Sequence, residues 1–355
     1  MTSPEPAPQS EALAAELARV LRSDGAAAPD LAPAAPVVVT GRSTLHRIAD
    51  RATGEQYLVK VPIVVSGWVD THDVLPPAAQ FEALERAYRW QSEEDRHAVV
   101  RPVAMLPEHD AFAMEWSPGR TVLQTLDRAP IDPRAARAAV RAAGDFLRRF
   151  HRHGWVAEEQ VALDGPVQEI RDLVAGPLRE AGLQLPAPVT AALDRLGGRS
   201  AVQTRALLHG DYVPSNLILR SAEEVVMIDP LLSDVGPTAD DLARFLTVLS
   251  SNTAFLPGVV LPPVRRLRRS LEAAFREAYG VGDLDELLEL RLLRQHLLRW
   301  LRRRENSRLR GAAPLLAARN RLIDRHMRAL VLESGARLAA AAREGSAPVR
   351  RLDEG

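Results

Sequence analysis

The residues best suited to chemistry lie between His209 and Asp229. His209-Gly210-Asp211 is followed after four residues by Asn216, and a later apolar run ends at Asp229. A carboxylate can take the proton of a hydroxyl, while an amide oxygen and a second carboxylate can hold Mg²⁺ on nucleotide phosphates. Asp211 fits the first role, and Asn216 and Asp229 fit the second. The spacing predicts γ-phosphoryl transfer from ATP to a hydroxyl, with His209, Asp211 and Asn216 as the catalytic set.

An ordinary turn between two strands is the alternative interpretation of this stretch. Asp, Gly, Pro, Ser and Asn are all common turn residues. The short strand Val225–Ile228, which places Asp229 at its end, favours the chemical interpretation. The elements around the stretch must decide between the two, because they have to position a nucleotide against it.

Lysine usage provides a second signal. The chain has 46 Lys and Arg residues, and Lys60 is its only lysine. An ammonium group fits between phosphate oxygens as a compact point charge, whereas the guanidinium fork is wider. Lys60 is therefore predicted to bind the nucleotide phosphates. Chance retention in an arginine-biased sequence is the alternative.

The pattern before and after Lys60 predicts an antiparallel sheet. Three strands are expected over residues 37–40, 45–49 and 56–61, with Lys60 near the end of the third. The first turn contains Gly41, Ser43 and Thr44, whose backbone N–H and hydroxyl groups are predicted to cover the phosphates. Two more strands are expected over 99–106 and 111–116, which makes five.

A helix predicted over residues 80–91 supplies a partner for Lys60. Glu85 shares its face with apolar residues and is the predicted partner, with Glu82 as the alternative one turn earlier. After the fifth strand, Glu115 and Trp116 lie in a predicted hinge whose backbone groups would read the adenine edge. Lys60, Glu85, Gly41, Ser43, Thr44, Glu115 and Trp116 are thus the predicted nucleotide-binding residues.

The remaining chain divides by composition. Residues 1–35 are expected to be a tail and linker with a short helix over 11–21 that is mobile or loosely docked. Residues 36–116 are the expected N-lobe, residues 117–340 a mainly helical C-lobe, and 341–355 a second tail. The insert at 62–79 contains His72 beside two aspartates, and a solvated loop is favoured there over a metal site.

At this point the chain resembles the aminoglycoside phosphotransferase and choline kinase-like superfamily. The resemblance rests on the motifs His209-Gly210-Asp211, Asn216, Ile228-Asp229-Pro230 and Asp241-Leu242-Ala243, and covers roughly residues 37–250. It implies an α+β, protein-kinase-like bilobal fold with an antiparallel five-stranded sheet plus one helix in the N-lobe. It also implies Asp211 as base, Asn216 and Asp229 on magnesium, and Asp241 as a support of the catalytic loop. The glycine-poor first turn departs from the family pattern.

Composition limits the partners. Formal net charge is zero and no apolar run is long enough to span a membrane, so neither nucleic-acid binding nor stable membrane insertion is expected. The chain has no cysteine, which excludes disulfides and thiolate chemistry. A cytoplasmic location is expected. Only about ten residues separate Asp229 from the helix expected near Thr238, which is too short for a protein-binding activation segment and predicts a small-molecule acceptor.

The acceptor's identity is left open by the sequence. Residues 262–340 are arginine-rich, which favours a neutral or anionic acceptor over a polycationic aminoglycoside, although arginines on solvated helix faces would look the same. Peripheral membrane contact through these helices is a further alternative. His296 lies in an apolar stripe and is predicted to be a core histidine. A non-catalytic nucleotide-binding protein and an antibiotic-modifying enzyme are the functional alternatives to a biosynthetic kinase.

Overall fold

The chain forms two compact units. The computed structural model describes residues 6–23, 29–40, 43–63, 75–90, 97–231, 235–282, 285–309 and 314–344. The first unit comprises Met1–Gly119 together with Val226–Leu231, and the second comprises Arg120–Val225 and Leu232–Gly355. The short segment around Asp229 thus returns to the first unit although most of its sequence neighbours belong to the second.

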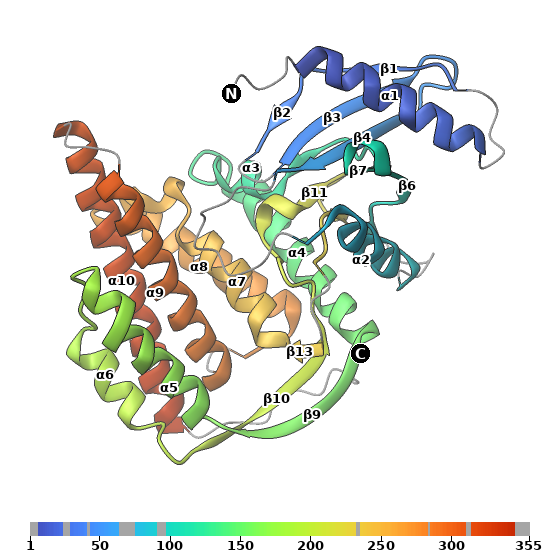
Figure 1. Ribbon diagram of the computed structural model, residues 1–355. Coiled ribbons are helices and arrows are strands. Elements are labelled where there is room, and N and C mark those ends of the chain that lie inside the picture. The colour runs from blue at the N-terminus through green and yellow to red at the C-terminus, as the bar shows by residue number, and fades with distance from the viewer. Residues whose placement is uncertain are drawn as a thin grey trace. The chain divides into compact units, whose positions relative to one another are not determined.

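An antiparallel sheet is the centre of the first unit (Figure 1). Its strand order is β1-β3-β4-β7-β6, and β2 also pairs with β3. Lys60 lies near the end of β4, opposite Leu45 of β3 and Phe112 of β7. The strands are β1 (Leu31–Pro33), β2 (Val38–Val39), β3 (Ser43–Asp50), β4 (Gln56–Pro62), β6 (Pro102–Leu106) and β7 (Ala111–Glu115).

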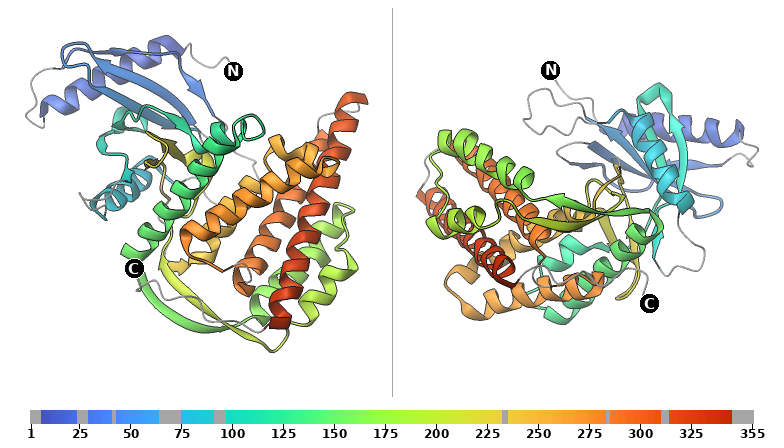
Figure 2. Two further views of the ribbon diagram at one scale, coloured as in Figure 1. Left: turned by 180° about the vertical axis from the view of Figure 1, so that it is seen from behind. Right: turned by 90° about the horizontal axis from the view of Figure 1, so that it is seen from below.

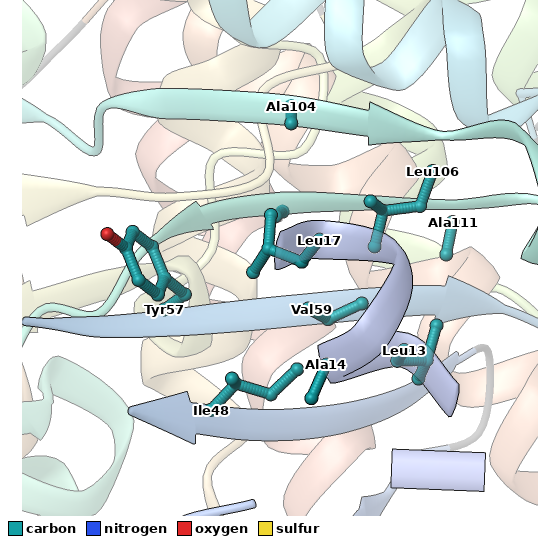
Figure 3. Close-up of a cluster of buried hydrophobic side chains, with 10 residues drawn as sticks. Leu13, Ala14, Leu17, Ile48, Tyr57, Val59, Ala104, Leu106 and Ala111 are labelled. Carbon is teal, nitrogen blue, oxygen red and sulfur yellow. The ribbon is translucent and has the colours of Figure 1, made fainter. Parts of the chain in front are cut away.

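The N-terminal helix α1 (Pro6–Ser23) packs on this sheet (Figure 3). Leu13 and Leu17 have no exposed surface and lie against Ile48, Val59 and other apolar side chains of the strands. Fully burying a leucine side chain contributes roughly 1.5–3 kcal/mol. The expectation of a loosely docked helix is therefore wrong: the helix is longer than predicted and covers part of the sheet.

The helix α2 (Pro77–Trp90) also belongs to the first unit and packs on β6 and β7. The segment that contains Asp229 enters the unit beside β5 (Ala98–Val99). Val226 and Met227 of β12 (Val225–Met227) pair in parallel with Ala98 and Val99. This pairing fixes the backbone just before Asp229.

The second unit combines helices with two small strand groups. A three-stranded sheet has the order β13-β10-β9, and the two strands β8 and β11 pair antiparallel. The stretch at 155–162 lies in the lobe expected to be mainly helical, but it forms strand β9 and pairs with β10. The strands are β8 (Arg120–Thr121), β9 (Trp155–Ala162), β10 (Ser200–Leu207), β11 (Leu217–Leu219) and β13 (Val235–Pro237).

The helices of the second unit form its apolar core. α7 packs against α9, α9 against α10, and α4 against α8 (Figure 2). The helices are α3 (Val122–Leu126), α4 (Pro133–His153), α5 (Asp164–Leu173), α6 (Ala187–Asp194), α7 (Thr238–Ser250), α8 (Pro262–Tyr279), α9 (Glu286–Leu309) and α10 (Pro314–Glu344). One π-helical turn (Val174–Leu178) and three 3₁₀ segments connect them: Pro107–His109 in the first unit, and Pro214–Asn216 and Thr253–Val259 in the second. Among the helices described, none is long and apolar enough to cross a membrane.

Candidate active site

The loop from His209 to Asn216 leaves strand β10 and ends in a 3₁₀ turn. Gly210 has φ = 81°, a left-handed conformation that a residue with a side chain adopts only at a cost. The backbone N–H of Asp211 donates to Nδ1 of the fully buried His209 at 3.1 Å. The ring of His209 thus closes a short turn that sets the direction of the Asp211 side chain.

Both carboxylate oxygens of Asp211 are held. Asn216 Nδ2 donates to Oδ2 at 3.1 Å and to the Asp211 carbonyl at 3.0 Å, while Arg244 Nη1 donates to Oδ1 at 3.1 Å. The Asp211 side chain is 29% exposed, so a hydroxyl compound can reach it. Because Asn216 uses its NH₂ group on Asp211, its amide oxygen points elsewhere and is suited to a cation.

Asp241, in the first turn of α7, anchors the loop that carries Asp211. Its carboxylate accepts hydrogen bonds from the backbone N–H groups of His209 at 2.7 Å and Gly210 at 3.1 Å. His151 Nε2 contacts the same carboxylate at 3.2 Å, and its Nδ1 lies 2.9 Å from the Tyr279 hydroxyl. Burial acts to raise the pKa of Asp241, but the hydrogen bonds and the nearby His151 and His209 rings hold it below its usual range.

Aromatic packing supports the same loop. Tyr212 is fully buried, donates its hydroxyl to the Ala143 carbonyl at 2.6 Å and stacks on Phe146. Its ring also contacts Phe245, which stacks on Phe275 with 4.1 Å between centroids. The residue after the predicted base is therefore fixed in the core, which leaves little freedom to Asp211 itself.

In the first unit, Lys60 pairs with Asp229. The Lys60 ammonium contacts the Asp229 carboxylate and lies 5.8 Å from the centroid of the Phe112 ring. The Lys60 side chain is only 10% exposed, and Asp229 has φ = 56°. A non-glycine residue in this left-handed region costs on the order of 1 kcal/mol or more, and such strain is often found at functional sites.

The carboxylate that Lys60 contacts in this structure is that of Asp229, and not that of either glutamate named from the sequence. Glu85 is half-buried on α2 and makes no ion pair with Lys60, whose ammonium contacts Asp229 instead. Glu82, the alternative, is exposed and pairs with Arg86 at 3.2 Å. The helical face was predicted correctly, because Ala83, Leu84 and Ala87 are buried, but a face does not determine which carboxylate is nearest to a charge on the sheet.

The predicted phosphate-covering turn is only partly described. Gly41 lies outside the described residues. Ser43 is buried and its backbone N–H donates to the Thr40 hydroxyl at 2.9 Å, while the Thr44 hydroxyl lies 3.1 Å from His46 Nε2. The Ser43 hydroxyl lies 3.0 Å from the Thr40 hydroxyl, so the hydroxyl groups of Ser43 and Thr44 both contact neighbouring side chains in this structure.

The hinge amides are also occupied. The Glu115 N–H donates to the Arg101 carbonyl and the Trp116 N–H to the Gln56 carbonyl, both at 2.9 Å. Neither amide can donate to an adenine edge in this arrangement, so other backbone groups of the segment would have to do so. The Trp116 ring lies under the Arg47 guanidinium, 4.6 Å from its centroid.

Two magnesium ligands are predicted from the sequence, Asn216 and Asp229. The described residues contain no group of three or more His, Asp or Glu side chains that could hold an ion. Mg²⁺ is commonly bound through one or two carboxylates with substrate phosphates completing its shell, and it keeps several waters. The carboxylate of Asp229 in the first unit and the amide oxygen of Asn216 in the second are each an oxygen ligand of the kind that magnesium takes.

Comparison with known proteins settles the family. Residues 43–293 match the model of the phosphotransferase enzyme family. The chain belongs to this family. The match covers more than half of the sequence and includes the loop, Lys60, Asp229 and Asp241, and it supports a small-molecule phosphotransferase. No curated protein sequence matches.

Solved structures share the fold at low sequence identity. A putative aminoglycoside phosphotransferase from Ralstonia eutropha JMP134 is 13% identical with a TM-score of 0.56, covering 94% of this chain and 99% of the other. A glucosamine kinase in complex with glucosamine, ADP and inorganic phosphate is 16% identical with a TM-score of 0.53, covering 90% and 85%. The predicted kinase-like bilobal fold is thereby confirmed.

Two residues around Asp211 were missed from the sequence. Arg244 follows Asp241 by three residues on α7, and His151, which contacts Asp241, is the third residue from the C-terminal end of α4. The spacing of Arg244 from Asp241 would have placed both near the loop. Nothing in the sequence around His151 distinguishes it from its neighbour His153, which lies two residues further along.

Proposed function

We propose that this protein is an ATP- and Mg²⁺-dependent O-phosphotransferase that phosphorylates a hydroxyl of a small molecule. The arrangement of Asp211 carries the proposal. Its carboxylate is partly exposed, held at both oxygens, and mounted on a loop anchored by the buried Asp241. A carboxylate fixed in this way can orient a hydroxyl and accept its proton as the hydroxyl oxygen attacks phosphorus.

Each predicted residue then has one role. Asp211 accepts the proton from the acceptor. Lys60 binds the nucleotide phosphates. Asn216 and Asp229 would hold a metal ion, which when bound would offset the negative charge of the phosphates. His209 orients Asp211 through its ring nitrogen and through the backbone that Asp241 holds.

The family match supports the reaction class, and the chemistry of the side chains supports the cofactors. A structurally similar glucosamine kinase contains ADP, which is consistent with an adenine nucleotide here. The acceptor is a sugar, sugar derivative, amino alcohol or antibiotic. A non-catalytic nucleotide-binding role is the alternative, and the complete set of Lys60, Asp211, Asn216 and Asp229 argues against it.

Acceptor-dependent ADP release tests the proposal. Purified protein would be supplied with ATP and Mg²⁺ and a panel of sugars, sugar phosphates, aminoglycosides, macrolides and amino alcohols. An Asp211→Asn variant is expected to bind ATP normally and to lose at least about 10²-fold in kcat, because general-base catalysis contributes that much or more. Equal turnover by Asp211→Asn would disprove the assigned base. Absence of turnover with every acceptor, despite Mg²⁺-dependent ATP binding, would favour the non-catalytic role.

A further inference from the structure

Most of the buried and half-buried arginines of the C-terminal helices are paired with carboxylates. Arg268 contacts Glu272 and Glu333, and Arg276 and Arg337 both contact Glu289. The same holds for Arg269 with Glu333, Arg291 with Asp240 and Glu169, Arg294 with Glu169, and Arg304 with Asp324. Ion pairs of this kind stabilise the packing of the helices, so these arginines need no ligand to explain them.

Arg299 and Arg303 of α9 are half-buried and are exceptions to this pattern. Within the described part of the chain, neither has a carboxylate partner, and the buried Arg299 Nε has no hydrogen-bond partner. Burial, together with the nearby guanidinium of Arg303 and that of Arg302, lowers the pKa of Arg299 to about 10. Burial and Arg319 lower the pKa of Arg303. Partly buried charges without a counter-charge are costly, so natural sequences rarely keep them without a reason.

These two arginines lie beside the C-terminal end of α7. His296 Nε2 lies 2.8 Å from the Ser250 hydroxyl, and Arg299 and Arg303 follow His296 by three and seven residues on the same side of α9. Arg303 Nη2 reaches the Ser251 carbonyl at 3.5 Å. The same helix α7 carries Arg244, which contacts Asp211.

Helix geometry relates the pair to the proposed base. Ser251, the C-cap residue of α7, follows Arg244 by seven residues, which is close to two turns, so the two positions lie at one side of the helix. Seven residues at 1.5 Å per residue correspond to about 10 Å. Arg244 therefore places a positive charge near Asp211, and Arg303 places another about 10 Å further along the same side of α7.

Helix capping explains only part of the arrangement. Arg303 could serve the last carbonyl groups of α7, since a cation is favourable at a helix C-terminus. Its contact at 3.5 Å is at the outer limit of a hydrogen bond, and His326 Nε2 already donates to the Ser250 carbonyl at 2.9 Å. Capping does not account for Arg299, which contacts neither carbonyl.

We propose that Arg299 and Arg303 form an anion-binding subsite for the acceptor. The acceptor would carry a phosphate or carboxylate about 10 Å from the hydroxyl that it presents to Asp211. This inference rests on the proposed kinase function. Arg244, close to the reacting hydroxyl, repels an ammonium group there, so a polycationic aminoglycoside is disfavoured and a phosphorylated or acidic sugar is favoured.

Anion binding tests the subsite without any need for turnover. Binding of sulfate and inorganic phosphate would be measured by calorimetry at constant ionic strength, in the wild type and in Arg299→Met, Arg303→Met and Arg294→Met. Arg294 lies on the same helix and pairs with Glu169, so it is the matched control. We expect about tenfold weaker binding in the first two variants, as for loss of a charge-assisted hydrogen bond, and unchanged binding in the control. Equal affinity in all four proteins, or no binding to the wild type, would overturn the subsite.

Thermal unfolding separates a ligand-binding role from a structural one. Without anion, Arg299→Met should unfold at the same temperature as the wild type or higher, because it removes an uncompensated partly buried charge. Sulfate should raise the unfolding temperature of the wild type more than that of Arg299→Met. A lower midpoint for Arg299→Met, with the same response to sulfate, would show that the residue is structural and would overturn the proposal.

Matched acceptors separate this inference from the kinase proposal itself. Glucose, glucose 6-phosphate, glucuronate and glucosamine differ mainly in charge, and relative kcat/KM would be measured for each. A higher kcat/KM for the two anionic sugars, which is reduced in Arg299→Met, supports the subsite. The ratio between glucose 6-phosphate and glucuronate then shows whether the subsite prefers phosphate or carboxylate. Preference for glucosamine, unaffected in Arg299→Met, overturns the subsite and leaves the kinase function intact. Anion binding at Arg299 without turnover on any acceptor would instead count against the kinase function.

Discussion

The carboxylate of Asp241 accepts a hydrogen bond from the backbone N–H of His209 at 2.7 Å, thirty-two residues earlier in the chain. A second bond, from Gly210, uses the other oxygen at 3.1 Å. This relationship links the first turn of α7 to the loop of Asp211. It means that the direction of the proposed base depends on a buried charge that never touches it.

Replacement of Asp241 by asparagine should therefore affect both stability and catalysis. An amide has only one acceptor oxygen, so one of the two loop N–H groups would face an NH₂ group. We expect the free energy of unfolding to fall by about 1–3 kcal/mol, the cost of an unsatisfied buried polar group. We also expect kcat to fall at least tenfold because Asp211 is displaced. Asp240→Asn, whose carboxylate is 39% exposed and paired with Arg291, is the control and should change little. Unchanged kcat in Asp241→Asn would contradict the anchoring role.

Replacement of Lys60 by arginine tests the role of the chain's only lysine. The change keeps the positive charge, but the wider guanidinium must fit a site that is 10% exposed, between Asp229 and Phe112. We expect kcat/KM for ATP to fall at least tenfold while the circular dichroism spectrum is unchanged. Arg51→Lys, at a 68% exposed position, is the reciprocal control and should have no effect. Wild-type kinetics in Lys60→Arg would show that a compact ammonium is not required.

Gly144 of α4 is predicted to be intolerant of any side chain. A Cβ atom there would lie 2.6 Å from the carbonyl oxygen of Phe275 and 3.0 Å from Ala278 Cβ, so α4 and α8 would have to separate. Overpacking of this kind costs typically 1–3 kcal/mol, and Gly144→Ala should lower the unfolding temperature by several degrees. Gly165→Ala, where nothing lies within 4 Å, should leave it unchanged or raise it. Equal unfolding temperatures for the two variants would show that α4 and α8 can accommodate the added methyl group without loss of stability.

The histidine at 296 should make stability depend on pH. Burial, with Arg337 and Arg268 nearby, holds the pKa of His296 well below its usual range. Below about pH 6.5 the unfolded chain binds a proton at His296 that the folded chain does not bind. The free energy of unfolding is therefore at its full value above that pH and falls as the pH is lowered. One such group contributes a slope of up to about 1.4 kcal/mol per pH unit. Urea unfolding of His296→Gln between pH 7 and 5 should show a smaller slope than the wild type. An identical slope would assign the effect to His326 or His46, whose pKa values are also lowered.

The sequence was most informative where a motif specifies local geometry. The spacing from Asp211 to Asn216 predicted two residues that the structure joins by a hydrogen bond at 3.1 Å, because both lie on one short loop. Lys60 was placed near the end of its strand, where it lies in β4, because alternating apolar residues identify a half-buried strand. His296 was predicted to be a core residue and is 1% exposed.

Contacts between distant elements were less predictable. Glu85 lies on the expected face of α2, yet Lys60 contacts Asp229, which is 169 residues away, since pairing of buried charges depends on tertiary geometry. The stretch from Trp155 lies in the lobe expected to be mainly helical, but it pairs with β10, and its weak apolar pattern gives little sign of a strand. Burial of α1 was missed because its alanine-rich sequence resembles that of a linker.

The contact between Lys60 and Asp229 has a practical consequence for chemical labelling. Since no other lysine exists in the chain, an amine-directed reagent has only Lys60 and the amino terminus to modify. A paired, mostly buried ammonium reacts slowly, so its acylation rate would report directly on how often this ion pair opens. Nucleotide, metal and acceptor titrations could then be followed at one side chain by mass spectrometry, without any engineered probe.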